Sequence, residues 1–524
     1  MSALSTIDRQ RKLMAALVHA AAQPPAVALV EVIETHISWV LLIGEYAYKF
    51  KKALNLGFLD YTTLEQRHHF CLEELRLNRR TAPTLYLQVV AITGTSDHPV
   101  IGGAGEAIEW AVKMQRFEQS QLASQLVQQD QLTFAHIDRL AHGVADFHWR
   151  IARAEPLSHF GSVESVCQPI EENFRQIHSL GDAADSLRSL QQLRDWYNSA
   201  IPKYKPLLER RKQEGYIREC HGDLHLGNIV IIGDEPTPFD GIEFNDNLRY
   251  VDVISEIAFL LMDLDHRQCS DLGWRFLDGY LQESGDFAGL GLLRFYQVYR
   301  AMVRAKVAAI RASQEGIDDT EHQSQLAEVE SYLQQALNYT HSPSPQLLLT
   351  HGFSGSGKSS VAQRLLEQWG AVRIRSDVER KRLFGLGAAA RSDSKVAEGI
   401  YTADASAQTY TRLAQLSALL LDAGFNVIVD ATFLRRADRE PLIRLAQSCH
   451  VPWHLLDVTA SVSTLRERIV TRDSGHRDAS EADRAVLDHQ LSHHDPLTVD
   501  EQAHCINVNT DGEWTIEPII RALI

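Results

Sequence analysis

The chain has 524 residues, of which 44% are hydrophobic and 23% charged, and its 52 basic and 68 acidic residues give a net charge of −16. This length predicts roughly two to four domains, and the hydrophobic content argues against wholesale disorder. The acidic balance argues against a protein that coats nucleic acids or anionic membranes, although a local basic pocket is compatible with it.

The sequence predicts a cytoplasmic protein without a membrane segment. Its six cysteines include no CxxC pair, which is typical of free thiols in a reducing compartment. The first twenty residues lack the basic and apolar regions of a signal peptide. The longest apolar runs, such as ISWVLLIG, are too short to cross a bilayer. The sequence does not indicate an oligomeric state.

The first two thirds of the chain predict a β-rich lobe followed by an α-rich lobe. After a helical pattern at 7–21, AVALVEVIE, SWVLLIG and YAYKFKK predict short strands. TTLEQRHHFCLEELRLNRR predicts a helix with Thr62 or Thr63 as its N-cap, and two further strand patterns follow. From about residue 120 the pattern is mainly helical. We therefore expect lobes at 1–117 and 118–339.

The last third of the chain has a different pattern. THSPSPQ, at 340–346, predicts a linker. Beyond it, the strands QLLLTHG, AVRIRSD and NVIVDAT alternate with helices, one of them long and ending near residue 423. This alternation predicts a parallel α/β sheet over 347–524, so that the whole chain combines α+β and α/β domains.

GFSGSGKS fits the phosphate-binding pattern GxxxxGK[ST] between a strand and a helix, which is the context that the motif requires. Lys358 is expected to reach the β- and γ-phosphates of ATP, and Ser359 to bind Mg²⁺. The predicted nucleotide-binding residues share this loop and the first turn of its helix: Gly352, Ser354, Gly355, Ser356, Gly357, Lys358, Ser359 and Ser360.

Acidic and basic residues near the predicted strand ends supply the other parts of this site. Asp430 ends a strand and is a candidate Mg²⁺ carboxylate, or alternatively a helix cap. Asp377 and Arg380 are candidates for accepting the acceptor's proton and holding an anionic acceptor, or alternatively a solvated helix start. Arg468 and Arg472 lie in an Arg-rich segment that is either a lid over the phosphate or an exposed helix face.

Residues 346–524 resemble the small P-loop kinases related to gluconate and shikimate kinases, zeta-type toxins and phage-type polynucleotide 5′-kinases. The spacing of Asp377 and Arg380 resembles the acceptor-binding segment of the polynucleotide kinases. The resemblance implies a kinase that transfers phosphate either to a small metabolite or to a polynucleotide 5′ end.

HGDLHLGNIV, at 221–230, allows three interpretations. Alternating His221, Asp223 and His225 could bind zinc on a strand, although no further His/Cys cluster completes the ligands. The stretch could also be a polar turn. The third interpretation is the catalytic loop of protein-kinase-like enzymes, in which Asp223 takes the acceptor's proton and Asn228 binds Mg²⁺. We prefer this third interpretation, because Asp240 follows a short hairpin and supplies a second metal carboxylate, with Glu243 as the alternative.

HGDLHLGN, FDGIEF and YVDVISEIAFLL together resemble the aminoglycoside phosphotransferase family, over about residues 25–300. The resemblance implies that Asp223 is the catalytic base and that Asn228 and Asp240 are the Mg²⁺ ligands. It also implies that Asp252 is a structural carboxylate.

The β-rich lobe should carry the lysine that pairs with ATP. Lys49 is the candidate, with Lys51 on the same strand face, and its carboxylate partner is Glu74 or, less well spaced, Glu73. We interpret Lys113, in a similar motif, as a hinge or surface residue. Where kinases carry a glycine-rich loop, this chain has only ETHIS, where Thr35 and Ser38 could substitute for the loop.

Three functions are compatible with these patterns. The preferred one is a bifunctional ATP- and Mg²⁺-dependent kinase, whose N-terminal site phosphorylates a small hydroxylated molecule and whose C-terminal site a metabolite or a polynucleotide 5′-hydroxyl. The second is a factor that processes nucleic-acid ends. In the third, the N-terminal domain senses nucleotide and only the P-loop domain turns over, which the missing glycine loop favours.

Overall fold

The structure is a computed structural model that describes residues 6–22, 30–57, 59–180, 184–314, 317–341, 343–388, 390, 399–473 and 483–524. The chain forms two compact units. The first comprises Met1–Leu140, Phe147–Glu172 and Pro202–Leu260, and the second comprises Ala141–Asp146, Asn173–Ile201 and Leu261–Ile524. This division cuts through the predicted α-rich lobe, so the domain boundaries at 117 and 339 stay predictions.

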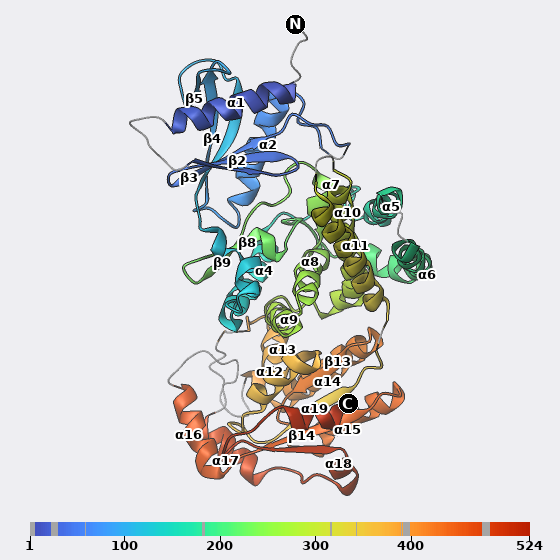
Figure 1. Cartoon of the computed structure of the whole chain (residues 1–524). Helices are drawn as coiled ribbons and strands as arrows, with labels where there is room; N and C mark the ends of the chain where they lie inside the picture. Colours follow the sequence, from blue (N-terminus) through green and yellow to red (C-terminus); the bar gives the residue numbers. More distant parts are fainter. Residues whose placement is uncertain are drawn as a thin grey trace. The chain divides into compact units, whose positions relative to one another are not determined.

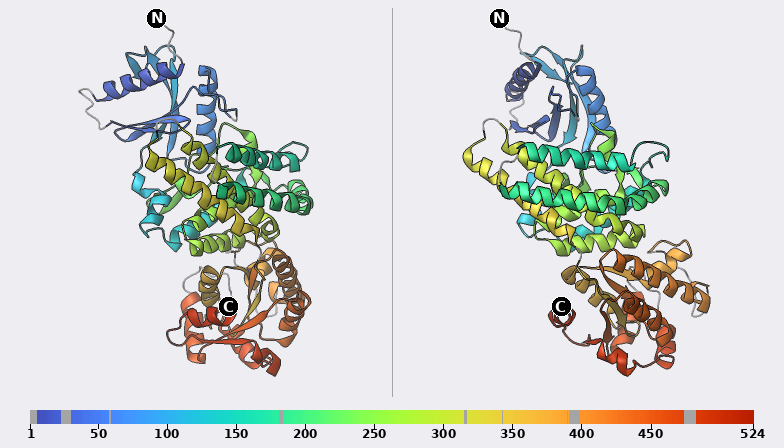
Figure 2. Two further views of the ribbon diagram at one scale, coloured as in Figure 1. Left: turned by 45° about the vertical axis from the view of Figure 1, so that its right-hand side comes forward. Right: turned by 90° about the vertical axis from the view of Figure 1, so that its right-hand side faces the viewer.

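The first unit begins with an antiparallel sheet in the order β1-β2-β3-β6-β4-β5. Side chains alternate across this sheet, so that Leu41 and Phe50 face α1 while Leu42 and Ala47 face α2 (Figures 1 and 2). A Thr63–Gln66 capping box fixes the start of α2. The elements of this lobe are α1 (Thr6–Ala21), β1 (Val30–Glu34), β2 (Ser38–Ile43), β3 (Tyr46–Lys51), α2 (Leu64–Asn78), β4 (Tyr86–Gly94), β5 (Pro99–Ile101) and β6 (Glu109–Gln115).

The next described part of the chain is mainly helical, as predicted, and is interrupted by two short antiparallel sheets, β7 with β10 and the hairpin of β8 with β9. The second of these sheets follows the HGDLHLGN segment directly. The elements are η1 (Gln119–Gln121), α3 (Ala123–Gln128), α4 (Phe134–Arg150), α5 (Val163–Leu180), α6 (Ala184–Gln213), β7 (Ile217–Glu219), η2 (Leu226–Asn228), β8 (Ile229–Ile232), β9 (Glu235–Pro238), α7 (Asp246–Arg249), β10 (Tyr250–Asp252) and α8 (Val253–His266).

Four further helical segments lie between this region and the predicted linker, and all of them belong to the second unit. They are α9 (Ser270–Ser284), η3 (Phe287–Leu292), α10 (Leu293–Ala312) and α11 (Asp319–Thr340). Helices α10 and α11 pack against each other, whereas α9 packs against α12 and β12 of the P-loop domain. No helix in the described part of the chain is long and apolar enough to cross a membrane.

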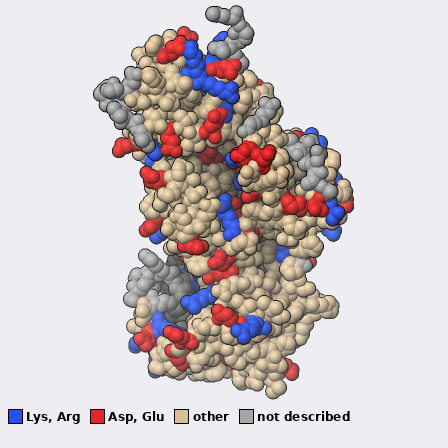
Figure 3. Space-filling view, viewed as in Figure 1, with Lys and Arg blue, Asp and Glu red and all other residues tan. Residues whose placement is uncertain are grey.

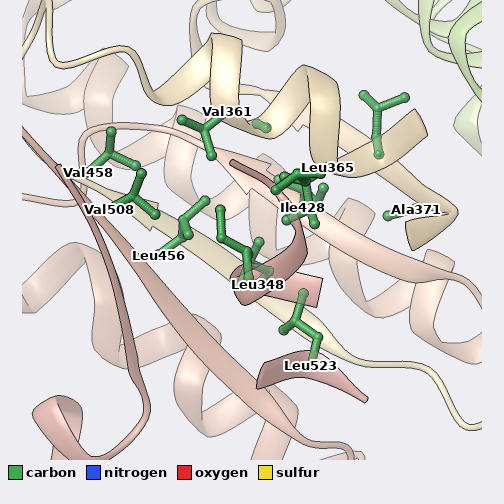
Figure 4. Packing of buried hydrophobic residues seen from close by; sticks show 13 residues of the cluster. Leu348, Val361, Leu365, Ala371, Ile428, Leu456, Val458, Val508 and Leu523 are labelled. Carbon is green, nitrogen blue, oxygen red and sulfur yellow. The ribbon is translucent and has the colours of Figure 1, made fainter. Parts of the chain in front are cut away.

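The C-terminal third is the predicted parallel sheet, with five strands in the order β12-β13-β11-β14-β15. Helices α12 and α19 cover one face, where Leu348, Val361 and Leu365 meet Ile428 and Leu456 (Figure 4). The elements are β11 (Leu347–His351), α12 (Lys358–Trp369), β12 (Ala371–Arg375), α13 (Ser376–Leu383), η4 (Gly399–Tyr401), α14 (Ala403–Asp422), β13 (Asn426–Asp430), α15 (Arg436–Ser448), β14 (Trp453–Thr459), α16 (Val462–Asp473), α17 (Arg484–Ser492), α18 (Val499–Ala503), β15 (Cys505–Asn509) and α19 (Glu517–Leu523).

One element prediction in this domain was wrong. The single long helix expected before residue 423 is two helices, α13 and α14. Helix α13 ends because Gly385 adopts a left-handed backbone conformation with a φ of 72°, which a helix cannot continue through.

Candidate active sites

Two lysines of β3 meet one glutamate of α2. Lys49 and Lys51 lie on the same face of the strand, and their ammonium groups contact opposite oxygens of the Glu74 carboxylate at 2.8 and 2.7 Å. Burial alone would raise the pKa of Glu74, but the two lysines lower it to about 2. The alternative partner, Glu73, instead pairs with Arg76. The structure therefore brings Lys49 and Glu74 together.

The segment that contains Asp223 is a loop and not a strand. His221 is buried, and its Nε2 lies 2.9 Å from the carbonyl oxygen of Phe239, so it packs behind the loop. His225 accepts the N–H of Gly227 through Nδ1. Asn228 donates its side-chain amide to the Asp223 carboxylate at 2.9 Å. This arrangement places Asp223 and Asn228 side by side, and two of the three side chains proposed for zinc serve the loop itself.

Asp240 and Glu243 differ in what surrounds them. The Asp240 side chain is 41% exposed and contacts Lys49, whereas Glu243 is only 5% exposed. Glu243 accepts hydrogen bonds from Lys51 and from the Tyr61 hydroxyl, the latter at 2.6 Å. Both of these hydrogen bonds are accepted by Oε1 of Glu243, in the interior. Asp240 is the more exposed of the two candidate metal carboxylates.

A further carboxylate, which the sequence reasoning missed, holds the loop in place. Glu256 of α8 accepts the backbone N–H of His221 at 2.8 Å and that of Gly222 at 2.7 Å. Burial would raise the pKa of Glu256, but hydrogen bonding and the charge of His148 contribute to lowering it to about 2. Asp252, which was expected to be structural, forms a buried pair with Arg211. In the sequence, the signal for Glu256 was an acidic residue inside the apolar stretch VDVISEIAFLL.

The turn that replaces a glycine-rich loop is short. It joins β1 to β2, and the Thr35 and Ser38 hydroxyls bond each other at 2.8 Å. The Lys52 ammonium bonds Glu34 and the Thr35 carbonyl, and this closes the turn onto β3. The two hydroxyls are thus engaged within the turn. Lys113, on β6, is half-buried, and its ammonium lies over the Tyr46 ring, 3.6 Å from the centroid.

The phosphate-binding loop follows β11 and leads into α12. Gly352, Gly355 and Gly357 have φ values of 137°, 84° and 89°, which only glycine adopts without strain. A Cβ at Gly352 would lie 2.3 Å from the carbonyl oxygen of Val458. Lys358 is buried at the start of α12, and its ammonium donates to the Phe353 carbonyl at 2.8 Å. Ser359 and Ser360 follow in the first helical turn, where Ser360 is exposed.

This loop has the atoms that ATP and Mg²⁺ require. Among the described residues, the Ser356 hydroxyl and one Asp430 oxygen are buried without a hydrogen-bond partner. Strand β13 ends in Asp430 and lies between β11 and β12, so Asp430 is at the same sheet edge as the loop. Unpartnered buried polar atoms are costly, which a phosphate and a hydrated cation would relieve. The residues present therefore fit both groups.

Two elements beyond the motif also hold the loop. Arg468 of α16 donates to the Gly355 carbonyl at 3.3 Å and to the Thr510 carbonyl at 2.6 Å, while Thr510 bonds the Ser356 carbonyl at 2.8 Å. Gln490 of α17 contacts both the N–H and the hydroxyl of Ser354. No sequence motif indicated Thr510 or Gln490. The side chain of Arg472 lies outside the described residues.

Asp377 and Arg380 lie in α13, directly after β12, at the same sheet edge. Asp377 makes no hydrogen bond or ion pair with other described residues. Arg380 is buried, donates to the Ile400 carbonyl and the Ser406 hydroxyl, and lies 5.0 Å from the Tyr401 ring. Its Nε has no partner in the described chain. Asp377 and Arg380 thus follow β12 at the sheet edge where the phosphate-binding loop follows β11.

Known proteins match the P-loop domain and also most of the chain. Residues 347–497 match a family model described as an AAA domain, which confirms the predicted P-loop domain. Uncharacterized proteins of Mycobacterium tuberculosis and Mycobacterium bovis are 32% identical to this chain over 458 residues, which is 87% of this chain and 89% of each relative. The chain belongs to their family. Its members share both parts of the chain.

Some solved structures are similar to parts of this chain. A choline/ethanolamine kinase family protein from Mesorhizobium loti is 11% identical, has a TM-score of 0.38, and covers 63% of this chain and 99% of its own. A gluconokinase from Sinorhizobium meliloti is 22% identical, has a TM-score of 0.24, and covers 34% of this chain and 89% of its own.

Proposed function

We propose that the chain is a bifunctional, cytoplasmic kinase with two separate sites that each transfer the γ-phosphoryl group of ATP to an acceptor hydroxyl. The observation that carries this proposal is that each site has its own set of phosphate-binding and carboxylate groups: Lys49, Asp223, Asn228 and Asp240 in one, and Lys358, Ser359, Asp377 and Asp430 in the other. The free state of all six cysteines supports the cytoplasmic location.

In the N-terminal site, Asp223 takes the proton of the acceptor hydroxyl, while Asn228 and Asp240 are the ligands that would hold Mg²⁺. Bound Mg²⁺ neutralises charge on the phosphate oxygens. Lys49, which contacts Asp240, binds phosphate oxygens of ATP. Glu74 keeps the ammonium of Lys49 in place.

In the C-terminal site, the loop N–H groups and Lys358 bind the phosphates, while Ser359 and Asp430 would hold Mg²⁺. Asp377 takes the proton of the acceptor, and Arg380 binds an anionic group of that acceptor. The unpartnered Nε of buried Arg380 supports a phosphate- or carboxylate-bearing acceptor. Arg468 holds the loop by donating to the Gly355 carbonyl.

A polynucleotide 5′-hydroxyl is the second acceptor class for the C-terminal site. The net charge is −16, and on the face in Figure 3 the Lys and Arg side chains of described residues are interspersed with Asp and Glu. Broad binding to a nucleic-acid backbone needs clustered positive charge. A small anionic metabolite is therefore our preferred acceptor, and the oligonucleotide is an arm of the test.

The short turn at Thr35 favours one alternative for the N-terminal site. Without a glycine-rich loop, fewer backbone N–H groups reach the phosphates, as expected of a domain that senses nucleotide without turning it over. The pairing of Asp223 with Asn228, beside an exposed Asp240, supports catalysis instead.

Phosphate transfer by single-site variants separates these functions. Asp223→Ala, Lys358→Ala and Asp377→Ala are assayed with ATP against sugars, aminoglycosides, anionic metabolites and 5′-hydroxyl oligonucleotides, with phosphorylated products detected by mass spectrometry. We expect Asp223→Ala to lower only N-terminal transfers, by about 10²–10⁴-fold, and Asp377→Ala to lower only C-terminal transfers by a similar factor. Lys358→Ala should likewise affect only the C-terminal transfers. Asp234→Ala, an exposed change on the β8–β9 turn, is the matched control.

Each outcome decides one part of the proposal. If Asp223→Ala leaves every transfer intact, the N-terminal domain is not a kinase and the sensing function replaces it. If Lys358→Ala leaves every transfer intact, the C-terminal site does not act. Phosphorylation of oligonucleotides but not of metabolites would replace the preferred acceptor with a 5′ end.

A further inference from the structure

A buried ion pair joins α9 to the P-loop domain within the second unit. Asp278 of α9 accepts from Arg373 of β12 through both oxygens, with Nη2–Oδ2 and Nε–Oδ1 distances of 2.6 and 3.2 Å. The two side chains are only 6% and 5% exposed. Asp278 lies well before residues 347–497, which match the AAA domain. Helix α9, which lies outside the matched residues, thus forms an ion pair with a buried residue of strand β12.

Arg373 also reaches the candidate metal end of the P-loop site. Its Nη1 donates to the carbonyl oxygen of Ser359 at 3.1 Å and lies 3.8 Å from Oδ2 of Asp430. That Asp430 oxygen is the one without a hydrogen-bond partner among the described residues. The guanidinium of Arg373 therefore lies between the carboxylates of Asp278 and Asp430. It forms hydrogen bonds with the carboxylate of Asp278 but not with that of Asp430.

The role of Asp278 follows from the charges of Arg373 and Asp430. A buried guanidinium without a counter-charge is strongly unfavourable, so Arg373 must pair with a carboxylate. Without Asp278, the nearest remaining carboxylate is that of Asp430, which is too close to be screened by water. A cation bonded to Asp430 would compete with Mg²⁺ for the same oxygen. The bidentate bond to Asp278 fixes the guanidinium plane, with Nη1 of Arg373 3.8 Å from Oδ2 of Asp430 and thus beyond hydrogen-bond distance.

We propose that Asp278 is a positioning residue of the C-terminal site, which holds Arg373 away from Asp430 and thereby sets the Mg²⁺ affinity of that site. The segment that precedes the linker thus completes a site in the P-loop domain. The inference rests on the proposed function only in that the P-loop site binds ATP together with Mg²⁺.

The test is a Mg²⁺ titration on the full-length protein in an Asp223→Ala background, so that the C-terminal site alone turns over. The concentration of Mg²⁺ that half-saturates ATP turnover is measured for the parent and for Asp278→Asn. We expect this concentration to rise about tenfold or more, because Mg²⁺ would then have to displace a charge-assisted hydrogen bond from Arg373 to Asp430. The maximal rate at saturating Mg²⁺ should change much less.

Three further variants separate this role from a general loosening of the interface. Arg275→Gln breaks another α9 ion pair, the 2.7 Å contact with Glu367, without touching Asp430, and should leave the Mg²⁺ requirement unchanged. Asp278→Glu keeps the charge and should retain most of the parent's Mg²⁺ affinity. Asp278→Asn/Arg373→Gln removes both charges and should restore the Mg²⁺ requirement if Arg373 is the competitor. This double variant also serves if Asp278→Asn alone fails to fold.

Binding of a fluorescent ATP analogue, titrated with Mg²⁺, provides a second readout that needs no turnover. If no variant or parent shows Lys358-dependent turnover, the proposed function fails, while the binding titration still tests Asp278. An equal rise for Arg275→Gln and Asp278→Asn, or no rise for Asp278→Asn by either readout, overturns the role of Asp278. A double variant that stays as weak as Asp278→Asn overturns the competition with Arg373.

Discussion

At the scale of single residues, the N-terminal site is unusual in having two lysines on one strand. Lys51 is buried between Glu74 and Glu243, and Tyr61 bonds the same Glu243. The charge of Lys51 contributes, with that of Lys49, to lowering the pKa of Glu74 to about 2. Glu74 is consequently held from both sides, by Lys49 and by Lys51.

The carboxylate of Glu256 predicts how stability depends on acid. Its pKa is about 2 in the folded chain against an ordinary 4.5, so the unfolded chain binds the proton first as the pH falls. The stabilisation is complete above about pH 4.5 and is lost as the pH falls towards 2, by up to about 3 kcal/mol. We expect urea unfolding between pH 3 and 7 to be less pH-dependent in Glu256→Gln than in the parent.

Glu235→Gln, at an exposed position after the β8–β9 turn, is the matched control and should keep the parent's pH dependence. Glu256→Gln should also lower stability at pH 7, because an amide oxygen cannot replace both oxygens that accept from His221 and Gly222. Equal pH dependence in Glu256→Gln and the parent would contradict the role of this carboxylate.

At the scale of elements, the C-terminal site is built by the ends of neighbouring parallel strands. The phosphate-binding loop follows β11, Asp430 ends β13, and Asp377 follows β12. The order β12-β13-β11 in the sheet makes these strand ends neighbours. Parallel strands present their carboxyl ends at one edge, which is why three segments far apart in the sequence form a single site.

The loop after β11 tolerates no side chain at its first glycine. Gly352→Ala would place a Cβ 2.3 Å from the Val458 carbonyl at a φ of 137°. We expect it to abolish binding of a fluorescent ATP analogue at the C-terminal site and to lower stability by about 1–3 kcal/mol. Gly143→Ala on α4, where a Cβ meets open space, is the control and should raise stability by about 0.5–1 kcal/mol. Normal ATP binding by Gly352→Ala would show that the loop can rearrange.

At the scale of the whole molecule, the P-loop domain shares its packing with the helix before it. Trp274 of α9 packs against the apolar cluster of α12 and lies close to Gly370. Arg382 of α13 donates to the Gln282 carbonyl at 2.6 Å, and burial lowers the pKa of Arg382 to about 10. These contacts lie within the second compact unit.

This packing predicts that the P-loop domain is impaired when it is cut out at the linker. A fragment of residues 343–524 would leave Arg373 without Asp278 and would expose the apolar surface that Trp274 covers. We expect its melting temperature to lie below that of the corresponding transition in the full chain, measured by calorimetry. A fragment of residues 268–524, which restores α9, should recover part of the difference. Equal melting temperatures for both fragments would contradict the contribution of α9.

The sequence determined by itself those features that depend on local spacing. The phosphate-binding loop, the parallel sheet and the loop of Asp223 and Asn228 follow from motifs and hydrophobic periodicity, since these reflect backbone geometry over a few residues. Lys49 was predicted from the resemblance to the aminoglycoside phosphotransferase family, and Glu74 from its spacing along the following helix.

Only the tertiary structure decided which groups meet across long distances in the chain. Glu243 contacts Lys51 and Tyr61 in the interior, whereas Asp240 is partly exposed and contacts Lys49. Glu256 supports the Asp223 loop, and Thr510 and Gln490 support the phosphate-binding loop. No sequence motif indicated these contacts. Hydrogen bonds and ion pairs depend on distance in space, and Asp278 meets Arg373 across 95 positions only because α9 packs on β12.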